Sequence, residues 1–373
     1  MPIEQAADVL EEIDPDDAVD IISVVQPEFS ADILVAMEPA DAAEIRELMA
    51  YRADTAGGIM TPEFVAIEPS LRADRAIAAL RRVAEEAETI NYVYVTDPDE
   101  HLLGVLSLHR LVLSRPDATV GELMYPDPVR VHVNDDQEGV ARLLTERHFL
   151  ALPVVDSEQR LVGIITADDV ADVLEDEATE DIERLGGSAP LFEPYLHASP
   201  FLLFRKRIVW LLVLFMAQFV TLEVYDHYSG VLESQILLAM FVPILIGTGG
   251  NVGSQTVTTI IRAMAVGEAA PRHFLRILSK EIITGAALGT VMGVLMFARG
   301  TIKDGQQFGL TVGLTVAVLI LWAAVVGAVL PLALSKMRVD PAVVSAPFIS
   351  SFVDATGLII YFSLAQLILP ISG

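Results

Sequence analysis

Residues 340–371 read DPAVVSAPFISSFVDATGLIIYFSLAQLILPI, and the rest of the chain is organised around this stretch. From Ala342 to Ile368 the run is long enough to span a bilayer as a helix. Its only charged residue is Asp354, roughly half-way along. A carboxylate at that depth costs about 2.5–3.5 kcal/mol even on the gentlest insertion scale, so by default it marks a function. We expect Asp354 to face a cation pathway; the alternative is a packing aspartate hydrogen-bonded to a neighbouring helix.

Composition divides the chain into two halves. Of the 51 acidic residues only 8 follow residue 200, and that mainly apolar part holds 11 of the 24 lysines and arginines. An acidic soluble half therefore precedes a membrane half, and its charge disfavours nucleic acid as a partner. The chain has no cysteine, which excludes disulfides and thiolate metal sites. It also contains no P-loop, GxSxG or HExxH motif, so we expect no enzyme activity.

The first 50 residues contain a repeat with a period of 24 residues. Residues 9–21 recur as residues 33–45, with Pro15 matched by Pro39 and apolar residues at helical spacing. This pattern predicts short helices joined by tight turns. Two such units are few for a free-standing solenoid, so we expect the segment to pack on a neighbouring domain.

A longer repeat of about 60 residues covers residues 55–178. Each copy opens with Met-x-Pro, at Met60 and Met124, and is predicted to continue as strand, helix, two strands and helix. The predicted elements are Phe64–Ile67, Ala73–Glu86, Tyr92–Val95 and Gly104–Ser107, and then Val129–Val133, Glu138–Glu146, Ala151–Val155 and Gly163–Thr166. The closing motif Gly-hydrophobic-hydrophobic-Ser/Thr-x-x-Asp is complete at Asp169, whereas the first copy has Arg110 in place of the acid. This order and these motifs resemble a tandem pair of CBS domains.

The repeat leads into an acidic segment, residues 168–200, and then into five apolar stretches. Apolar residues at helical spacing predict a helix that ends or bends at Gly186-Gly187 before the membrane. The five predicted spans are Phe204–Val224, Gln235–Ala265, His273–Ala298, Phe308–Leu334 and Ala342–Ile368. Basic residues gather where the chain enters the first span and around the loops after the second and fourth: Arg205, Lys206, Arg207, Arg262, Arg272, Arg276, Lys280, Lys336 and Arg338. By the positive-inside rule the soluble half is cytoplasmic and the C-terminus lies outside.

The second predicted span contains PILIGTGGNVGSQT, residues 243–256. One proline and four glycines within eleven residues are expected to break or bend the helix, and irregular backbone in a membrane is tolerated when it is buried or lines a water-filled cavity. The polar residues beside the glycines favour a pore wall. The alternative is a close crossing of helices through glycine-rich surfaces.

PILIGTGGNVGSQTVTTIIRAMAVGE, residues 243–268, resembles the signature of MgtE-type magnesium channels, and so does DPAVVSAPFISSFVDATGLIIYF, residues 340–362. The order of helical domain, CBS pair, connecting helix and five spans also matches this family. The chain departs from it in two places. Its N-terminal domain is shortened, since the family's is usually over twice as long, and the family often carries a more polar residue near the position of Ala346.

The resemblance implies a homodimer with Asp354 on the ion path and regulatory acids outside the membrane. The implied pore-lining residues are Gly247, Gly250, Asn251 and Thr258. The implied regulatory metal ligands, which lie between the cytosolic domain and the connecting helix, are Asp169, Asp172, Glu177, Glu180 and Asp181, with Asp136 and Glu138 at a CBS dimer contact. Asp14, Asp16, Asp17 and Asp20 are candidates for a similar part. The alternative for each single acid is a solvated surface position.

The family pattern also implies a nucleotide site in the CBS pair. Tyr92 and Phe149 would sandwich an adenine, and Thr166 is a further candidate contact for ATP. Arg110 stands where an acid should meet the ribose, and together with His109 it offers a basic pair that could meet phosphate instead. The alternative is that the aromatic side chains are ordinary core residues.

The sequence thus predicts a multi-domain protein. We expect a shortened helical domain over residues 1–53, an α/β tandem CBS domain over 54–174, an acidic connecting helix over 175–200 and an all-α transmembrane domain of five helices over 201–373. The predicted function is a homodimeric channel of the cell membrane that imports Mg²⁺ and is closed by cytosolic Mg²⁺. The alternatives are a transporter of Co²⁺ or Zn²⁺ and a membrane-anchored CBS nucleotide sensor without transport.

Overall fold

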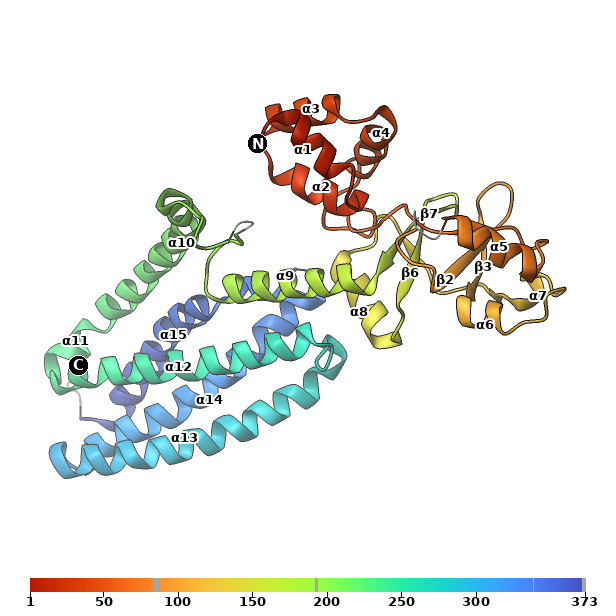
Figure 1. Ribbon diagram of the computed structural model, residues 1–373. Coiled ribbons are helices and arrows are strands. Elements are labelled where there is room, and N and C mark those ends of the chain that lie inside the picture. Colours follow the sequence, from red (N-terminus) through yellow and green to blue (C-terminus); the bar gives the residue numbers. More distant parts are fainter. Residues whose placement is uncertain (84–86, 192–193, 338, 371–373) are drawn as a thin grey trace. The chain divides into compact units, whose positions relative to one another are not determined.

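The computed structural model describes residues 1–83, 87–191, 194–337 and 339–370 (Figure 1). Arg338 and the predicted end of the helix at Glu86 lie outside these ranges. The chain divides into two compact units, Met1–Glu177 and Ala178–Gly373, which are described separately.

The first unit begins with four short helices. They are α1 (Ile3–Leu10), α2 (Pro15–Val24), α3 (Pro27–Ala36) and α4 (Pro39–Leu48). The repeat is confirmed, because α1 and α2 recur as α3 and α4 with the predicted period, and a proline opens α2, α3 and α4 where its missing N–H is not needed. The predicted packing on a neighbour is also confirmed, since Ile22 and Ile45 belong to the same buried cluster as Leu152 and Ile165 of the second CBS copy.

The two CBS copies have the predicted order of elements. The first contains β1 (Ala66–Ile67), α5 (Ala73–Val83), β2 (Tyr92–Thr96), β3 (Leu102–Ser107) and α6 (Leu108–Val112), followed by α7 (Val120–Leu123) and β4 (Tyr125–Pro126). The second contains β5 (Val131–His132), α8 (Gln137–Arg147), β6 (Ala151–Val155) and β7 (Leu161–Thr166). The sheets have the orders β1-β2-β3-β4 and β5-β6-β7, each with one parallel pair, β1–β2 and β5–β6.

The copies exchange their opening segments, which explains both sequence motifs. Strand β4, from the opening of the second copy, pairs with β3 of the first, and Thr61 bridges to Ile164 in β7. A Cβ on Gly104 would lie 2.6 Å from Met124 Sδ, and one on Gly163 would lie 2.8 Å from Met60 Sδ. The methionine of each Met-x-Pro opening therefore packs against the glycine of the other copy's closing motif.

The predicted connecting helix is continuous with the closing helix of the second CBS copy. Both form α9 (Ala167–Leu185), and the chain turns at Gly187, whose φ is +76°. The helix therefore ends beside the predicted glycine pair.

The second unit contains the five predicted spans. Long apolar helices are α10 (Pro200–His227), α12 (Leu237–Ala265), α13 (Phe274–Asp304, preceded by a 3-10 turn from Pro271), α14 (Gln306–Lys336) and α15 (Ala346–Ile368), with a short α11 (Ser229–Ser234) between the first two. A 3-10 turn, Pro341–Val343, connects α14 to α15.

The expected break in the second span is wrong. Helix α12 runs without interruption through Pro243 and the glycines. A Cβ on Gly249 would lie 2.8 Å from a Val353 side-chain carbon, and one on Gly253 would lie 2.6 Å from a carbon of Ile349. Glycine weakens a helix by about 1 kcal/mol relative to alanine, but here it permits a close crossing of α12 and α15. The alternative that these glycines serve helix packing is thus the one the structure supports.

Candidate ion pathway and regulatory sites

Helix α15 places Asp354 in the third turn of the fifth span. The helix starts at Ser345, whose side-chain oxygen accepts hydrogen bonds from Phe348 N, at 3.3 Å, and from Trp210 Nε1, at 2.9 Å. Asp354 is half-buried, and its Oδ1 is buried without a hydrogen-bond partner in the described part of the chain. A buried carboxylate oxygen without a partner is unfavourable, so the contacts within one chain do not account for this residue.

Helices α12 and α15 pack antiparallel, and their register fixes what lies beside Asp354. Gly250 contacts Ser350, and Ser254 Oγ lies 3.3 Å from the carbonyl oxygen of Ala346. Asp354 is one turn beyond Ser350 along α15, so it lies at the level of Gly247 on α12. A Cβ on Gly247 would meet no atom within 4 Å, so the space beside this residue is open.

One face of α12 carries polar residues that no other described part of the chain covers. Gly247, Asn251, Gln255 and Thr258 are exposed and follow one another at helical spacing of four, four and three residues. Lipid offers no hydrogen-bond partner for such groups at membrane depth, so this face requires water, an ion or another protein surface. Three of the four predicted pore-lining residues lie here, whereas Gly250 is buried against Ser350.

In the first unit, acids of α2 lie close to acids at the start of α9. Burial raises the pKa of Asp16 to about 7, and the charge of Asp169 adds to this shift. Burial also raises the pKa of Asp20, with further contributions from Asp17, Asp176, Asp169 and Asp172. Asp16 Oδ1 is buried without a hydrogen-bond partner among the described residues. The structure thus brings the candidate acids of the N-terminal helices together with Asp169 and Asp172, two of the predicted regulatory ligands.

Three further acids adjoin this cluster and were not recognised from the sequence as a group. Carboxylate oxygens of Asp14, Glu63 and Glu88 lie within 4.8 Å of one another. Burial, followed by the charges of Asp14 and Asp16, raises the pKa of Glu88 to about 7. Glu63 and Glu88 belong to separate loops of the first CBS copy, and no spacing in the sequence relates them to Asp14.

Several predicted metal ligands have protein partners. Asp169 Oδ2 accepts from Thr166 Oγ1 at 2.5 Å, and burial raises its pKa. Glu177 accepts from Gln137 Nε2 at 2.7 Å, and Glu180 forms an ion pair with Arg184. Asp172 is exposed, and Asp181 is half-buried. In α8, Asp136 caps the helix by accepting from Gly139 N at 3.4 Å, and Glu138 pairs with Arg142 at 2.7 Å.

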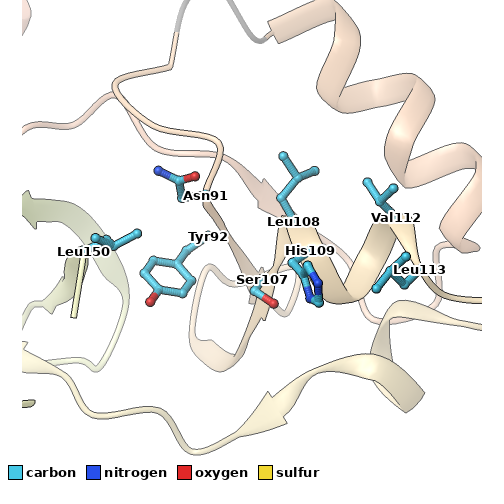
Figure 2. A pocket seen from close by; sticks show the side chains of 8 residues that line it. All are labelled: Asn91, Tyr92, Ser107, Leu108, His109, Val112, Leu113 and Leu150. Carbon is cyan, nitrogen blue, oxygen red and sulfur yellow. The ribbon is translucent and has the colours of Figure 1, made fainter. Parts of the chain in front are cut away.

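A pocket of about 490 Å³ lies beside the closing motif of the first CBS copy (Figure 2). It is lined by Asn91, Tyr92, Ser107, Leu108, His109, Val112, Leu113 and Leu150. Figure 2 shows the Tyr92 ring between Leu150 and Ser107. This lining includes neither Phe149, which packs on another buried cluster, nor Thr166, which is buried and bonded to Asp169. The Arg110 guanidinium lies 4.4 Å from the centre of the Tyr125 ring, a cation–π contact.

Comparison with known proteins identifies the family. The profile of MgtE, described as a divalent cation transporter, matches residues 242–364, which include Asp354 and most of α12. The profile of the MgtE intracellular N domain matches residues 1–54, and that of the CBS domain matches 56–116 and 120–176. The magnesium transporter MgtE of Thermus thermophilus is 43% identical over 327 residues, which cover 87% of this chain and 72% of that protein. The chain belongs to the MgtE family.

A second transporter agrees with this assignment, and one solved structure is also similar in sequence. The magnesium transporter MgtE of Enterococcus faecalis is 35% identical over 87% of this chain and 71% of its own length. The solved structure is described as the crystal structure of the cytosolic domain of the Mg²⁺ channel MgtE in complex with ATP. Its chain is 43% identical in sequence to this one, and the match covers 46% of this chain and 71% of the solved chain, with a TM-score of 0.46. MgtE proteins are transporters rather than enzymes, and with its five apolar helices this member is a multi-pass membrane protein.

Proposed function

We propose that the protein is a homodimeric, Mg²⁺-selective channel in which Asp354 binds the permeating ion. The observation that carries the proposal is the half-buried carboxylate of Asp354, with one oxygen unpartnered, at the level of the exposed polar face of α12. A second copy related by a two-fold axis would cover that face and bring a second Asp354 opposite the first. The polar face would then line an aqueous path instead of meeting lipid.

Mg²⁺ suits this arrangement because it prefers oxygen ligands and loses its water reluctantly. Two carboxylates can hold a largely hydrated ion, and the hydroxyl and amide groups of Thr258 and Asn251 can bind its water molecules. A membrane potential of 100 mV supplies about 4.6 kcal/mol of inward drive on a divalent ion, so the channel needs no other source of energy. In this proposal the soluble unit is cytoplasmic and the C-terminus lies outside, an orientation that the basic loops support by the positive-inside rule.

Cytosolic Mg²⁺ regulates the channel in this proposal by binding the acids of α2 and α9. The carboxylates of Asp16, Asp20, Asp169 and Asp172 repel one another when they are ionised, and a divalent cation between them replaces repulsion by attraction. Because Mg²⁺ then binds the packed arrangement better than the open one, it shifts the equilibrium towards the closed channel. Asp136 and Glu138 would add a similar site at the contact between two CBS domains.

A carrier for Co²⁺ or Zn²⁺ is the main alternative within transport. Those ions favour imidazole and thiolate ligands, whereas the chain has no cysteine and the candidate pathway offers oxygen atoms. The other alternative, a CBS sensor without transport, leaves Asp354 and the polar face of α12 without a purpose. Expression of the chain in a cell deficient in magnesium uptake should restore growth at low external Mg²⁺. Growth that stays dependent on high Mg²⁺ would contradict the proposal.

Nucleotide binding is proposed for the pocket beside Tyr92. Its apolar lining suits a base, and His109 offers a partner for phosphate. Replacing Tyr92 by alanine should weaken ATP binding about tenfold, because a stacking face is lost. Phe149→Ala is the matched control, since Phe149 does not line the pocket and its loss should have a smaller effect. Calorimetry on the full chain measures both, and no heat of ATP binding to the unmodified protein would refute the site.

The acids of α2 also predict a pH dependence in the absence of Mg²⁺. The raised pKa of Asp16 means that the packed arrangement holds a proton that a free aspartate loses near pH 4. Packing of α2 against α9 therefore weakens progressively as the pH rises from about 4, where a free aspartate ionises, to about 7, where Asp16 ionises in the packed arrangement, and it changes little above pH 7. Spin labels on Ser23→Cys and Glu146→Cys should be closer together at pH 5 than at pH 8, as measured by pulsed electron resonance. Asp16→Asn should remove most of the difference, and equal distances in the unmodified background would contradict the prediction.

A further inference from the structure

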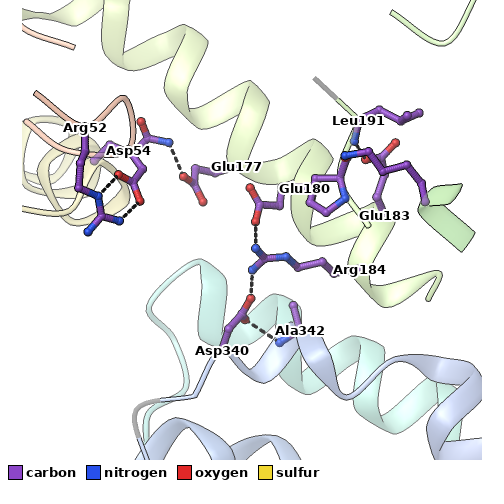
Figure 3. Close-up of polar contacts among 12 residues, drawn as sticks. Arg52, Asp54, Glu177, Glu180, Glu183, Arg184, Leu191, Asp340 and Ala342 are labelled. Atoms are coloured by element: carbon purple, nitrogen blue, oxygen red, sulfur yellow. Dashed lines mark hydrogen bonds and ion pairs between the residues drawn. The ribbon is translucent and has the colours of Figure 1, made fainter. Parts of the chain in front are cut away.

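The guanidinium of Arg184, near the end of α9, lies between two carboxylates from different parts of the second unit (Figure 3). Its Nη2 pairs with Glu180 Oε1, one turn back along α9, and its Nη1 pairs with Oδ2 of Asp340, 156 residues further along the chain. The other oxygen of Asp340 accepts a hydrogen bond from Ala342 N at 2.8 Å, which caps the turn that leads into α15. Arg184 thus links the connecting helix to the entry of the span that carries Asp354.

Neighbouring contacts bring the same elements together. The ring of Trp210 leaves room only for a glycine at 187, since a Cβ there would lie 2.8 Å from Trp210 Cδ1. Trp210 Nε1 in turn donates to Ser345, the residue that caps α15. Leu185 packs against the buried cluster of the membrane helices. The end of α9, helix α10 and the start of α15 therefore form one junction, here called the α9 junction.

The α9 junction contains two carboxylates, Glu180 and Asp340, and one guanidinium, Arg184, that pairs with both. Without Arg184, the carboxylates of Glu180 and Asp340 would face each other with no cation between them. The side chains of Glu180 and Asp340 are 28% and 35% exposed, so water screens the repulsion only partly. Arginine stays protonated at every physiological pH and its fixed fork can hold two carboxylates at once. Its charge is also present at any concentration of Mg²⁺.

We propose that Arg184 is a built-in cation that holds the α9 junction together when Mg²⁺ is absent. The inference rests on the proposed gating by Mg²⁺ and adds a contact that does not depend on the ion. In this scheme Mg²⁺ acts on the acids near the start of α9, while Arg184 keeps the end of the same helix on the pore domain. Because Arg184 keeps the junction formed before Mg²⁺ binds, it lowers the Mg²⁺ concentration at which the channel closes.

The test is Arg184→Gln, which removes the charge but keeps hydrogen-bond donors. The matched control is Arg160→Gln, because Arg160 also holds two carboxylates, Asp156 and Glu158, but within a single hairpin of the second CBS copy. Hydrogen exchange of amides 183–191 is followed in the full chain in lipid nanodiscs, with MgCl₂ as the only added ligand. Mg²⁺ flux through the same variants is measured in liposomes.

For Arg184→Gln we expect faster exchange at zero Mg²⁺, where the unmodified protein is already protected, and protection that returns only as Mg²⁺ is added. The Mg²⁺ concentration that half-closes the channel should rise about three- to tenfold. Protection of these amides should also depend more steeply on the Mg²⁺ concentration, because Glu180 and Asp340, freed from Arg184, together bind one more Mg²⁺ ion. Adding Glu180→Gln to the variant should remove that extra steepness. Arg160→Gln should behave as the unmodified protein.

Unchanged exchange in Arg184→Gln at zero Mg²⁺ would overturn the inference. If that variant does not assemble, Asp340→Asn breaks the same link from the other side, and unchanged exchange there overturns the inference equally. The two readouts separate this inference from the proposed function. Altered exchange without any flux in the unmodified protein would refute the channel and keep the junction, whereas normal Mg²⁺-dependent flux with unaltered exchange would refute the junction alone.

Discussion

Replacing Asp354 by alanine should reduce Mg²⁺ flux by about 100-fold or more, while the protein still inserts and assembles. Placing a carboxylate at this depth in the membrane costs about 2.5–3.5 kcal/mol of insertion free energy, and in the proposed channel the attraction of a bound cation offsets this cost. Removing it takes away a comparable attraction for the ion, which corresponds to roughly two orders of magnitude in binding. Flux of Mg²⁺ into liposomes, normalised to the amount of inserted protein, is the measurement.

Two further variants isolate the cause. Asp354→Asn keeps the shape and removes the charge, so it should lose almost as much flux as the alanine variant. Asp226→Ala makes the same substitution at the exposed end of α10 and should retain normal flux. Equal flux in the unmodified protein and in Asp354→Ala would show that the carboxylate serves only in helix packing.

The second large effect is expected from the triple variant Asp20→Asn, Asp169→Asn and Asp172→Asn. It should stay open at Mg²⁺ concentrations that close the unmodified channel, with the midpoint for closure raised at least about tenfold. Asparagine amides bind Mg²⁺ far more weakly than carboxylates, so the bridging attraction between α2 and α9 is lost. Several weak sites that act together also make the normal response steep, and the variant's response should be shallow.

A control variant tests whether the change in net charge alone matters. It neutralises three exposed acids elsewhere in the N-terminal helices, with Glu28→Gln, Asp32→Asn and Glu47→Gln. This control changes the net charge equally and should close at the normal Mg²⁺ concentration. If the test variant also closes at the normal concentration, the acids are solvated surface residues and the gate is elsewhere. A test variant that is shut at every Mg²⁺ concentration would contradict bridging and show that repulsion alone opens the channel.

Much of the fold could be predicted because its signals are local or repeated. The 24-residue period predicted the short helices α1 to α4, and the Met-x-Pro and closing motifs predicted both CBS copies. The reason for those motifs could not be predicted, because Met60 meets Gly163 and Met124 meets Gly104 only after the copies exchange segments. The five spans follow from length and hydropathy alone.

The failed prediction in α12 has a physical reason. Glycine and proline weaken a helix through local propensity, and the sequence of residues 243–256 therefore indicated a break. In the structure the same glycines admit the side chains of Val353, Ile349 and Leu319 against the backbone, and this tertiary packing outweighs propensity. The polar residues among and after the glycines were still informative, because helical spacing places Asn251 and Thr258 on one exposed face.

Contacts between charged side chains that are far apart in the chain could not be predicted from the sequence. Nothing in the spacing of Asp14, Glu63 and Glu88 indicates that their oxygens gather within 4.8 Å. The family resemblance implied that Glu180 is a metal ligand, and in the structure Glu180 forms an ion pair with Arg184. Charge counts reveal that a segment is acidic, but only the folded chain decides which acids share a site.

The most direct test of the central claim is uptake of Mg²⁺ into liposomes that contain the purified protein, with an inside-negative potassium diffusion potential as the sole driving force. The account predicts rapid uptake that grows with the potential, requires no proton or sodium gradient and is lost in Asp354→Asn. No uptake under the potential, or uptake that Asp354→Asn leaves unchanged, would contradict it.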